Sequence, residues 1–235
     1  MKALTHIISL FILVAILSCS KNEEPWTPGQ ENKLVSFDDL KVGDKFQYSL
    51  FVGESYFDAG NHNFEYKDDY LNIEVVEKIP NGFRVKEWID QSSNMFSSSE
   101  NYYYKDMDTV YLNNWILKND KIVVEPIIEE YLYSHLFIDG YKTIELPLNR
   151  FNGEEVEITS WKTDKGFSES NSDFFVTNFK LFEFTYPHLN VVVRDEPMAA
   201  DGNGNTYIYS REAGFVRAVT YSAWTGKGLG WDRVK

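Results

Sequence analysis

The chain has 235 residues, of which 43% are hydrophobic, 16% aromatic and 25% charged, a composition that excludes disordered, collagen-like and coiled-coil proteins. Its 36 acidic residues outnumber the 23 basic ones, so the basic surface that a polyanion needs is missing and we expect no nucleic-acid partner. One cysteine cannot form an internal disulfide, and no motif indicates a structural zinc site.

The first residues have the pattern of an export signal. Lys2 precedes the apolar run from Ile7 to Leu17, which is shorter than the stretch of about 20 residues that spans a bilayer. Ile16-Leu17-Ser18-Cys19 resembles a bacterial lipobox, which implies removal of residues 1–18 and transfer of diacylglycerol to Cys19. An ordinary signal peptide with a coincidental cysteine is the alternative.

The next residues, Ser20 to Glu24, resemble the lipoprotein export signal of Bacteroidota, which sends proteins to the outer face of the outer membrane. A simple solvated spacer is the alternative, and Pro25 and Pro28 suit one. We therefore expect a lipidated, flexible tether at 19–33, attached to the outer membrane, and one β-rich domain at 34–235.

Alternating apolar residues predict strands through most of the remaining chain. Phe46, Tyr48, Leu50 and Val52 share one strand face, and Pro80-Asn81-Gly82 predicts a hairpin turn. Other predicted strands are Leu71–Ile79, Phe83–Ile89, Tyr102–Tyr104, Val110–Leu112, Trp115–Leu117, Ile122–Val124, Tyr141–Leu146, Val156–Trp161, Phe174–Tyr186, Leu189–Arg194, Thr206–Arg211 and Phe215–Tyr221. This spacing predicts an all-β, mainly antiparallel fold, either a β-sandwich or a curved, partly closed barrel.

One helix is predicted within this β pattern. Glu125-Pro126 places proline at a first-turn position, and Ile128, Leu132 and His135 or Leu136 then fall on one helical stripe. Such a helix would cover a barrel mouth or a sheet edge.

Two segments resemble parts of exported bacterial β-rich proteins. Leu40 to Tyr48, with its Gly-Asp turn before an aromatic strand, is similar to their first strand, and Tyr207 to Arg217 is similar to their closing hairpin. The resemblance implies a curved half-barrel of the lipoprotein-carrier type.

A loop of oxygen-bearing residues offers a candidate calcium site. Asp201, Asn203 and Asn205 alternate, and Glu212 stands at the offset of the bidentate carboxylate of an EF-hand loop. Thr206 occupies the place of the required glycine. A glycine-rich hairpin loop is therefore the alternative, and no other cofactor is expected.

Catalytic machinery is not evident. His62, His135 and His188 lack ligand-like spacing, and no Gly-x-Ser-x-Gly motif occurs. We therefore expect a noncatalytic protein. Acidic pairs such as Asp68-Asp69, Glu129-Glu130 and Glu154-Glu155 keep a glycoside hydrolase with a carboxylate pair as an alternative.

Aromatic residues exceed what one sheet face needs. Trp224 and Trp231, separated by a glycine-rich stretch that we expect to be exposed, together with Tyr207 and Tyr209, are the candidate ligand-binding residues. Aromatic surfaces bind sugars or apolar molecules, and a large β core is the alternative. The first hypothesis is a noncatalytic, lipid-anchored outer-membrane protein whose single β domain binds a ligand or a partner in a curved aromatic groove. The second is a carbohydrate-binding surface lipoprotein of a glycan-uptake system.

Overall fold

The structure is a computed structural model that describes residues 34–54, 63–90, 109–128, 132–137, 143–159, 162–163, 173–195, 203–222 and 226–234. Leu34–Lys235 form one compact unit. The predicted signal peptide, Cys19 and the tether lie outside the described residues, as does the predicted strand Tyr102–Tyr104.

The described part of the chain is almost entirely β-strand. Its elements are η1 (Phe37–Asp39), β1 (Lys45–Glu54), β2 (Asn63–Ile79), β3 (Gly82–Asp90), β4 (Tyr111–Leu117), β5 (Lys121–Pro126), β6 (Ile144–Pro147), β7 (Glu154–Glu155), β8 (Ile158–Thr159), β9 (Lys162–Thr163), β10 (Phe174–Leu181), β11 (Phe184–Asp195), β12 (Asn203–Ser210), β13 (Gly214–Ser222) and β14 (Lys227–Arg233). Among the described residues, the only helical segment is the short 3-10 turn η1, and none is long and apolar enough to cross a bilayer.

Twelve strands form one sheet in the order β6-β5-β4-β3-β2-β1-β14-β13-β12-β11-β10-β7, and β8 pairs with β9. Every neighbouring pair in the large sheet is antiparallel except β10 and β7. The predicted all-β, mainly antiparallel fold is confirmed, and the sheet is open, with β6 and β7 at its edges.

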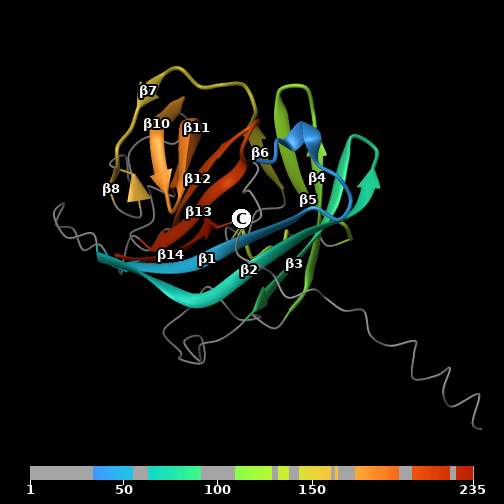
Figure 1. Ribbon diagram of the computed structural model, residues 1–235, viewed down its shortest axis with the longest axis horizontal. Coiled ribbons are helices and arrows are strands. Elements are labelled where there is room, and N and C mark those ends of the chain that lie inside the picture. The colour runs from blue at the N-terminus through green and yellow to red at the C-terminus, as the bar shows by residue number, and fades with distance from the viewer. Residues whose placement is uncertain are drawn as a thin grey trace, which may run out of the picture. The chain divides into compact units, whose positions relative to one another are not determined.

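The first and last strands of the sheet pair at its centre. β1 and β14 run antiparallel from Tyr48 opposite Arg233 to Glu54 opposite Lys227, and Figure 1 shows them side by side in blue and red. From β1 the chain proceeds outward as the meander β2 to β6, and from β14 the order runs back through β13 to β10. The sheet therefore has two wings that meet at this pair: the first wing consists of β1 to β6, and the second wing of β14, β13, β12, β11, β10 and β7.

Several predicted local features are confirmed. Phe46, Tyr48 and Leu50 are buried together in the core cluster. Asn81 adopts a positive φ of 59° in the turn between β2 and β3, as expected for a tight hairpin in which asparagine tolerates the left-handed region. The predicted hairpin after Leu117 also forms, because Leu117 lies opposite Ile122.

The predicted helix after Glu125-Pro126 is wrong. Pro126 is the last residue of β5 and lies opposite Asn113 in β4, and residues 132–137 are not helical. Ile128, expected on the buried stripe, is 92% exposed, whereas Leu132 and Leu136 are buried. The hairpin pairing of β4 and β5 continues as far as the proline, which can end a strand as well as begin a helix.

The predicted strand Phe174–Tyr186 is instead two strands joined by a turn at Phe182-Glu183. Phe182 has a positive φ of 50°, a conformation that bulky residues rarely adopt. No glycine or asparagine marks this turn in the sequence. The β10–β11 hairpin therefore places the Phe182 ring at its tip.

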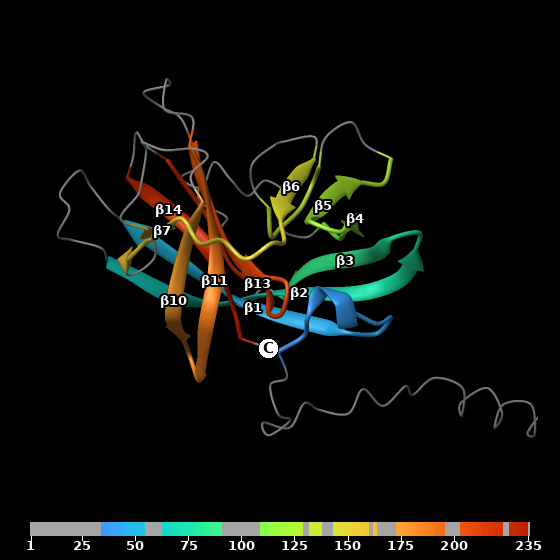
Figure 2. The ribbon, with the colours of Figure 1, turned by 90° about the horizontal axis from the view of Figure 1, so that it is seen from above.

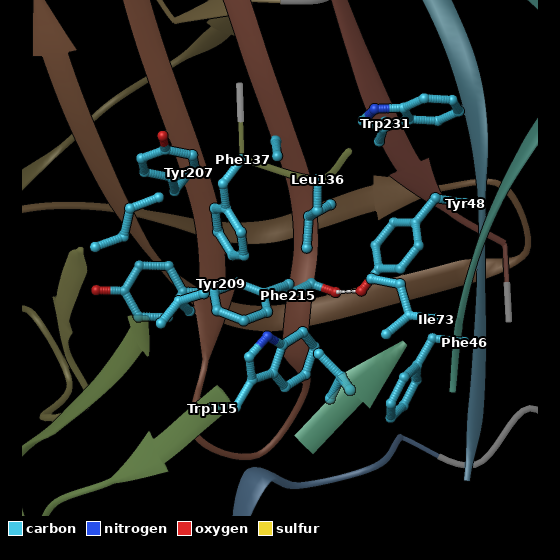
Figure 3. Close-up of a cluster of buried hydrophobic side chains, with 14 of the residues drawn as sticks. Phe46, Tyr48, Ile73, Trp115, Leu136, Phe137, Tyr207, Tyr209, Phe215 and Trp231 are labelled. Carbon is cyan, nitrogen blue, oxygen red and sulfur yellow. Dashed lines mark hydrogen bonds between the residues drawn. The ribbon is translucent and has the colours of Figure 1, made fainter. Parts of the chain in front are cut away.

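The interior of the first wing is filled by aromatic rings from both wings (Figure 3). Trp115 and Phe215 meet edge to face at 5.1 Å between ring centroids. The Tyr48 hydroxyl donates a 3.0 Å hydrogen bond to the carbonyl oxygen of Phe215, the dashed line in Figure 3. Because Tyr48 belongs to β1 and Phe215 to β13, this core joins the two wings.

Residues 132–137 form a plug in this interior. Leu136 and Phe137 are buried in the cluster, and Figure 3 shows them among the rings. The plug is held by the fully buried Glu87, whose carboxylate accepts hydrogen bonds from the Ser134 hydroxyl at 2.8 Å and from the backbone N–H of His135 at 2.8 Å. A buried carboxylate is stable there because donors surround it.

Side chains of the second wing bind the edge strand β6. The Tyr209 hydroxyl donates to the carbonyl oxygen of Pro147 at 2.8 Å, and Arg194 Nη2 donates to that of Glu145 at 2.8 Å. Side chains thus satisfy backbone acceptors at an edge that no further described strand covers. The open sheet is partly closed in this way.

The second wing also has a core of its own, separate from the aromatic interior described above. Figure 2 shows β10 and β11 running across the direction of β1 and β2. The side chains buried in this core come from the β7 segment and β10 to β13: Val156, Phe174, Val176, Phe179, Leu181, Tyr186, Leu189, Val191, Val193, Ile208, Ala213 and Val216. The candidate site lies beside this second core.

Candidate functional site

The three predicted ligand-binding aromatics that the structure describes do not form an accessible surface. Trp231 is 0% exposed, and Tyr207 and Tyr209 are also buried in the interior core. The expectation that Trp231 is exposed is wrong, because Gly228 and Gly230 before it belong with it to the central strand β14. Trp224 lies outside the described residues.

Glycine has a packing role in β14. A Cβ atom at Gly230 would lie 2.4 Å from the Phe51 ring and 2.7 Å from the carbonyl oxygen of Ala218. The missing side chain lets the ring of the neighbouring strand lie against the sheet. Gly230, which indicated exposure in the sequence, is therefore required by close packing.

The residues of the predicted calcium loop are not brought together. Asn205 lies within β12, whereas Glu212 lies in the turn beyond the other end of that strand. An extended chain rises about 3.3 Å per residue, so these two side chains are too far apart to share an ion. Asn203 is also in β12, and Asp201 lies outside the described residues. The described residues contain no group of three potential metal ligands.

The histidines and acidic pairs that the structure describes lie in separate parts of the fold. His62 and Glu129-Glu130 lie outside the described residues. His135 Nε2 lies 2.7 Å from the carbonyl oxygen of Thr109, and the nearby Ser134 hydroxyl donates to Glu87. Because the described bond of this imidazole is to a backbone oxygen and the serine bonds the acid directly, this cluster is not arranged as a catalytic triad.

The remaining candidates lie in the second wing or on β2. The His188 ring stacks on Phe175 with centroids 4.9 Å apart. Burial, reinforced by the positive charge of Arg150, lowers the pKa of His188 below its ordinary value. Asp68 is exposed while Asp69 is buried, and Glu154 and Glu155 are both exposed.

A groove of about 780 Å³ lies where β10 faces the start of β2. We call it the β10 groove. It is lined by Phe64, Tyr66, Glu155, Val156, Glu157, Ile158, Val176, Thr177, Asn178, Phe179, Lys180, Leu181, Phe182 and Arg217. Its volume falls within the range of pockets for small molecules, roughly 300 to 1,000 Å³, and most of its walls are apolar, as such pockets usually are.

Aromatic rings connect the two sides of the β10 groove. Phe64 and Tyr66 meet edge to face at 5.5 Å on β2. The Phe182 ring, at the tip of the β10–β11 hairpin, lies 5.1 Å from the Tyr66 ring. Tyr66 and Phe182 are 39% and 41% exposed, so a ligand can reach both rings.

A buried ion pair lies beneath these rings. Arg217 on β13 donates from Nε and Nη2 to the two carboxylate oxygens of Asp232 on β14, at 2.5 and 2.6 Å. The Tyr66 hydroxyl donates to Asp232 Oδ2 at 2.6 Å. The side chains of Arg217 and Asp232 are 3% and 0% exposed, so their mutual pairing compensates for the lost hydration.

Aromatic rings also surround the guanidinium. It lies 5.1 Å from the Phe51 ring centroid and 5.3 Å from that of Phe179, within cation–π range. Burial acts to lower the pKa of Arg217, but the charge of Asp232 and its hydrogen bond raise the pKa above its ordinary value. Burial and the charge of Asp232 also raise the pKa of Tyr66. The arginine therefore stays charged and the tyrosine stays a donor at physiological pH.

The sequence reasoning did not find this site. Phe64 and Tyr66 stand in a stretch that reads as polar, and Phe182 stands within an apparent single strand. The available signal was the presence of opposite charges, Arg217 and Asp232, each directly preceded by apolar residues. Charged residues at such positions are rarely buried unless they are paired.

Comparisons with known proteins identify no relative: no family model, curated protein or solved structure matches the chain.

Proposed function

We propose that this chain is a noncatalytic, lipid-anchored outer-membrane lipoprotein whose β domain binds an apolar or amphiphilic small molecule in the β10 groove. The observation that carries the binding proposal is the accessible aromatic wall made by Phe64, Tyr66 and Phe182. The sequence supports the anchor, through the lipobox-like residues that end at Cys19.

The wall combines the features of a binding site for an apolar molecule. Val156, Val176 and Leu181 extend the apolar lining behind the aromatic rings. The polar groups at the groove are few, and the deepest of them, Arg217, is paired with Asp232. Such a site gains affinity from buried apolar surface and orientation from a few polar groups.

The binding proposal is tested with Nile red, an uncharged dye whose emission rises and shifts to the blue in apolar sites. We expect saturable binding that weakens at least fivefold in Phe64→Ala and in Phe182→Asn. Asparagine tolerates the positive φ at position 182, so the second variant removes the ring without disturbing the turn. Ile128→Ser is the matched control, because Ile128 is exposed and does not line the groove. Equal binding by all four proteins would contradict the proposal.

The anchor is tested separately by labelling cells with an alkyne analogue of palmitate. The wild-type chain should acquire the label and fractionate with the outer membrane, and Cys19→Ser should do neither. Protease treatment of intact cells then determines which side of the membrane the domain occupies.

A carbohydrate ligand is the second candidate, favoured by the exposed rings of Tyr66 and Phe182 at the groove mouth. Aromatic faces stack on sugar rings as well as on apolar molecules. Retardation on polysaccharide gels that is lost in Phe182→Asn, together with no Nile red binding, would select this candidate. Turnover of a glycan that is abolished in Glu155→Gln would instead indicate the hydrolase.

A further inference from the structure

The charges around the β10 groove define the kind of polar group that its ligand can carry. The charged residues that line it are Glu155, Glu157, Lys180 and Arg217. The charge of Arg217 is balanced by Asp232, which both its Nε and its Nη2 contact. Two carboxylates and one ammonium group then remain, so the groove has a net negative charge.

The carboxylate of Asp232, the acidic member of the buried ion pair, already has hydrogen-bond partners. Asp232 accepts two hydrogen bonds from Arg217 and one from Tyr66, and Phe51 and Phe179 lie on the guanidinium. An anionic ligand group that approaches Arg217 would meet the carboxylate of Asp232, and to pair with Nε and Nη2 it would have to replace that carboxylate. That exchange leaves the displaced aspartate buried without its partner, which is strongly unfavourable.

The rim adds a second barrier to anions. Glu155 and Glu157 are exposed at the groove, and Glu155 accepts a hydrogen bond from the Thr177 hydroxyl. These carboxylates repel an approaching anion, and the formal charge of −13 for the whole chain acts in the same direction.

We infer that the β10 groove selects apolar ligands whose polar end is uncharged, such as an alcohol or an ester, and rejects ligands that end in a carboxylate or a phosphate. The Arg217–Asp232 pair provides this selectivity by cancelling the positive charge that Arg217 places at the groove floor. An uncharged polar group can still donate a hydrogen bond to the Thr177 hydroxyl oxygen, and it can donate to or accept from the Asn178 side chain at the groove. The inference rests on the proposed binding function and names the ligand class of the same site.

The test is competition against bound Nile red by decanol and decanoate at pH 8, each below its aggregation concentration. These probes have the same chain length and differ in charge. We expect decanol to displace the dye from the wild-type chain at a concentration at least tenfold lower than decanoate does. Equal displacement by the two probes would overturn the charge selectivity while leaving the groove as the binding site, because Nile red binding itself reports the proposed function.

Two variants identify the source of the selectivity. In Asp232→Asn the guanidinium loses its counter-charge, and decanoate should improve relative to decanol by at least tenfold. The double substitution Glu155→Gln and Glu157→Gln changes only exposed side chains, and it should strengthen displacement by decanoate about threefold. In the wild type, added salt should reduce the repulsion between these carboxylates and decanoate. If Asp232→Asn does not fold, the double variant and the salt series still decide: no change in either would contradict the inference.

Discussion

Trp231 donates a 2.8 Å hydrogen bond from Nε1 to the backbone carbonyl oxygen of His135. One residue belongs to the central strand β14 and the other to the plug, so this bond links the middle of the sheet to the segment that fills its interior. Its position explains why a tryptophan with features of a surface residue in the sequence is fully buried.

Trp231→Phe should lower the free energy of unfolding by about 1–3 kcal/mol, because it leaves a buried carbonyl without its donor. Trp231→Ala should cost about 3–5 kcal/mol, since it adds a cavity. Urea unfolding followed by circular dichroism measures both. Trp88→Phe, at a partly exposed position of β3, is the control and should cost less than about 1 kcal/mol. Equal losses at the two positions would contradict the role assigned to Trp231.

Glu87→Gln should destabilise the protein by about 1–3 kcal/mol even though the shape is retained. One carboxylate oxygen accepts from the backbone N–H of His135 and the other from Asn113 Nδ2. An amide can accept at only one of these positions, and its NH₂ then faces a donor.

The control for this prediction is Glu77→Gln. Glu77 forms a 2.5 Å ion pair with Arg84 at the surface, and exposed pairs of this kind contribute at most about 1 kcal/mol. Thermal unfolding of the two variants compares them directly. A Glu87→Gln protein as stable as the wild type would show that donors around this carboxylate do not hold the plug.

Gly230→Ala should cost about 1–3 kcal/mol through overpacking. The new methyl group would overlap the Phe51 ring and the Ala218 carbonyl, and neither belongs to a flexible surface segment. Thr185→Ala, at an exposed position of β11, is the control in the same denaturant series. Unchanged stability of Gly230→Ala would mean that the β1–β14 pair yields more easily than its geometry indicates.

The stability of the domain should fall as the pH is lowered through about 6.5, in part because of His188. Burial and Arg150 lower the pKa of His188 in the folded state, so the unfolded chain binds a proton at a pH where the folded chain does not. Stability therefore rises with pH across this window. Glu155 and Glu212 oppose the shift. In His188→Gln the difference in denaturation midpoint between pH 5 and pH 7 should be smaller, and an identical difference would exclude His188 as its source.

Local chemistry in the sequence was sufficient for part of the fold. The Asn81 turn and the alternation of Phe46, Tyr48 and Leu50 depend on neighbouring residues alone, and both were predicted. The turn at Phe182 was not, because its strained φ of 50° is maintained by tertiary packing, which includes the contact of its ring with Tyr66. The helix predicted after Pro126 failed for a related reason, since proline is compatible with both elements and pairing with β4 decides between them.

The candidate site depends still more on distant residues. Tyr66, Phe182 and Arg217 come from three separate parts of the chain, and the fold brings them together in the β10 groove. Periodicity identifies which residues are apolar but not which strands meet across a groove. The same limitation explains why Trp231 was expected to be exposed and is buried. Neighbouring glycines can indicate either a mobile segment or the close approach of another strand, and the sequence does not distinguish the two.

The pairing of β1 with β14 at the centre of the sheet constrains how the protein reaches its fold. A ribosome must have passed residue 233 before β1 can acquire its second neighbour. Until then both wings have an unsatisfied inner border, and high contact order makes their joining slow. During synthesis the nascent chain therefore cannot complete its sheet early. A polypeptide must remain incompletely folded in this way if it is to pass through a translocation channel.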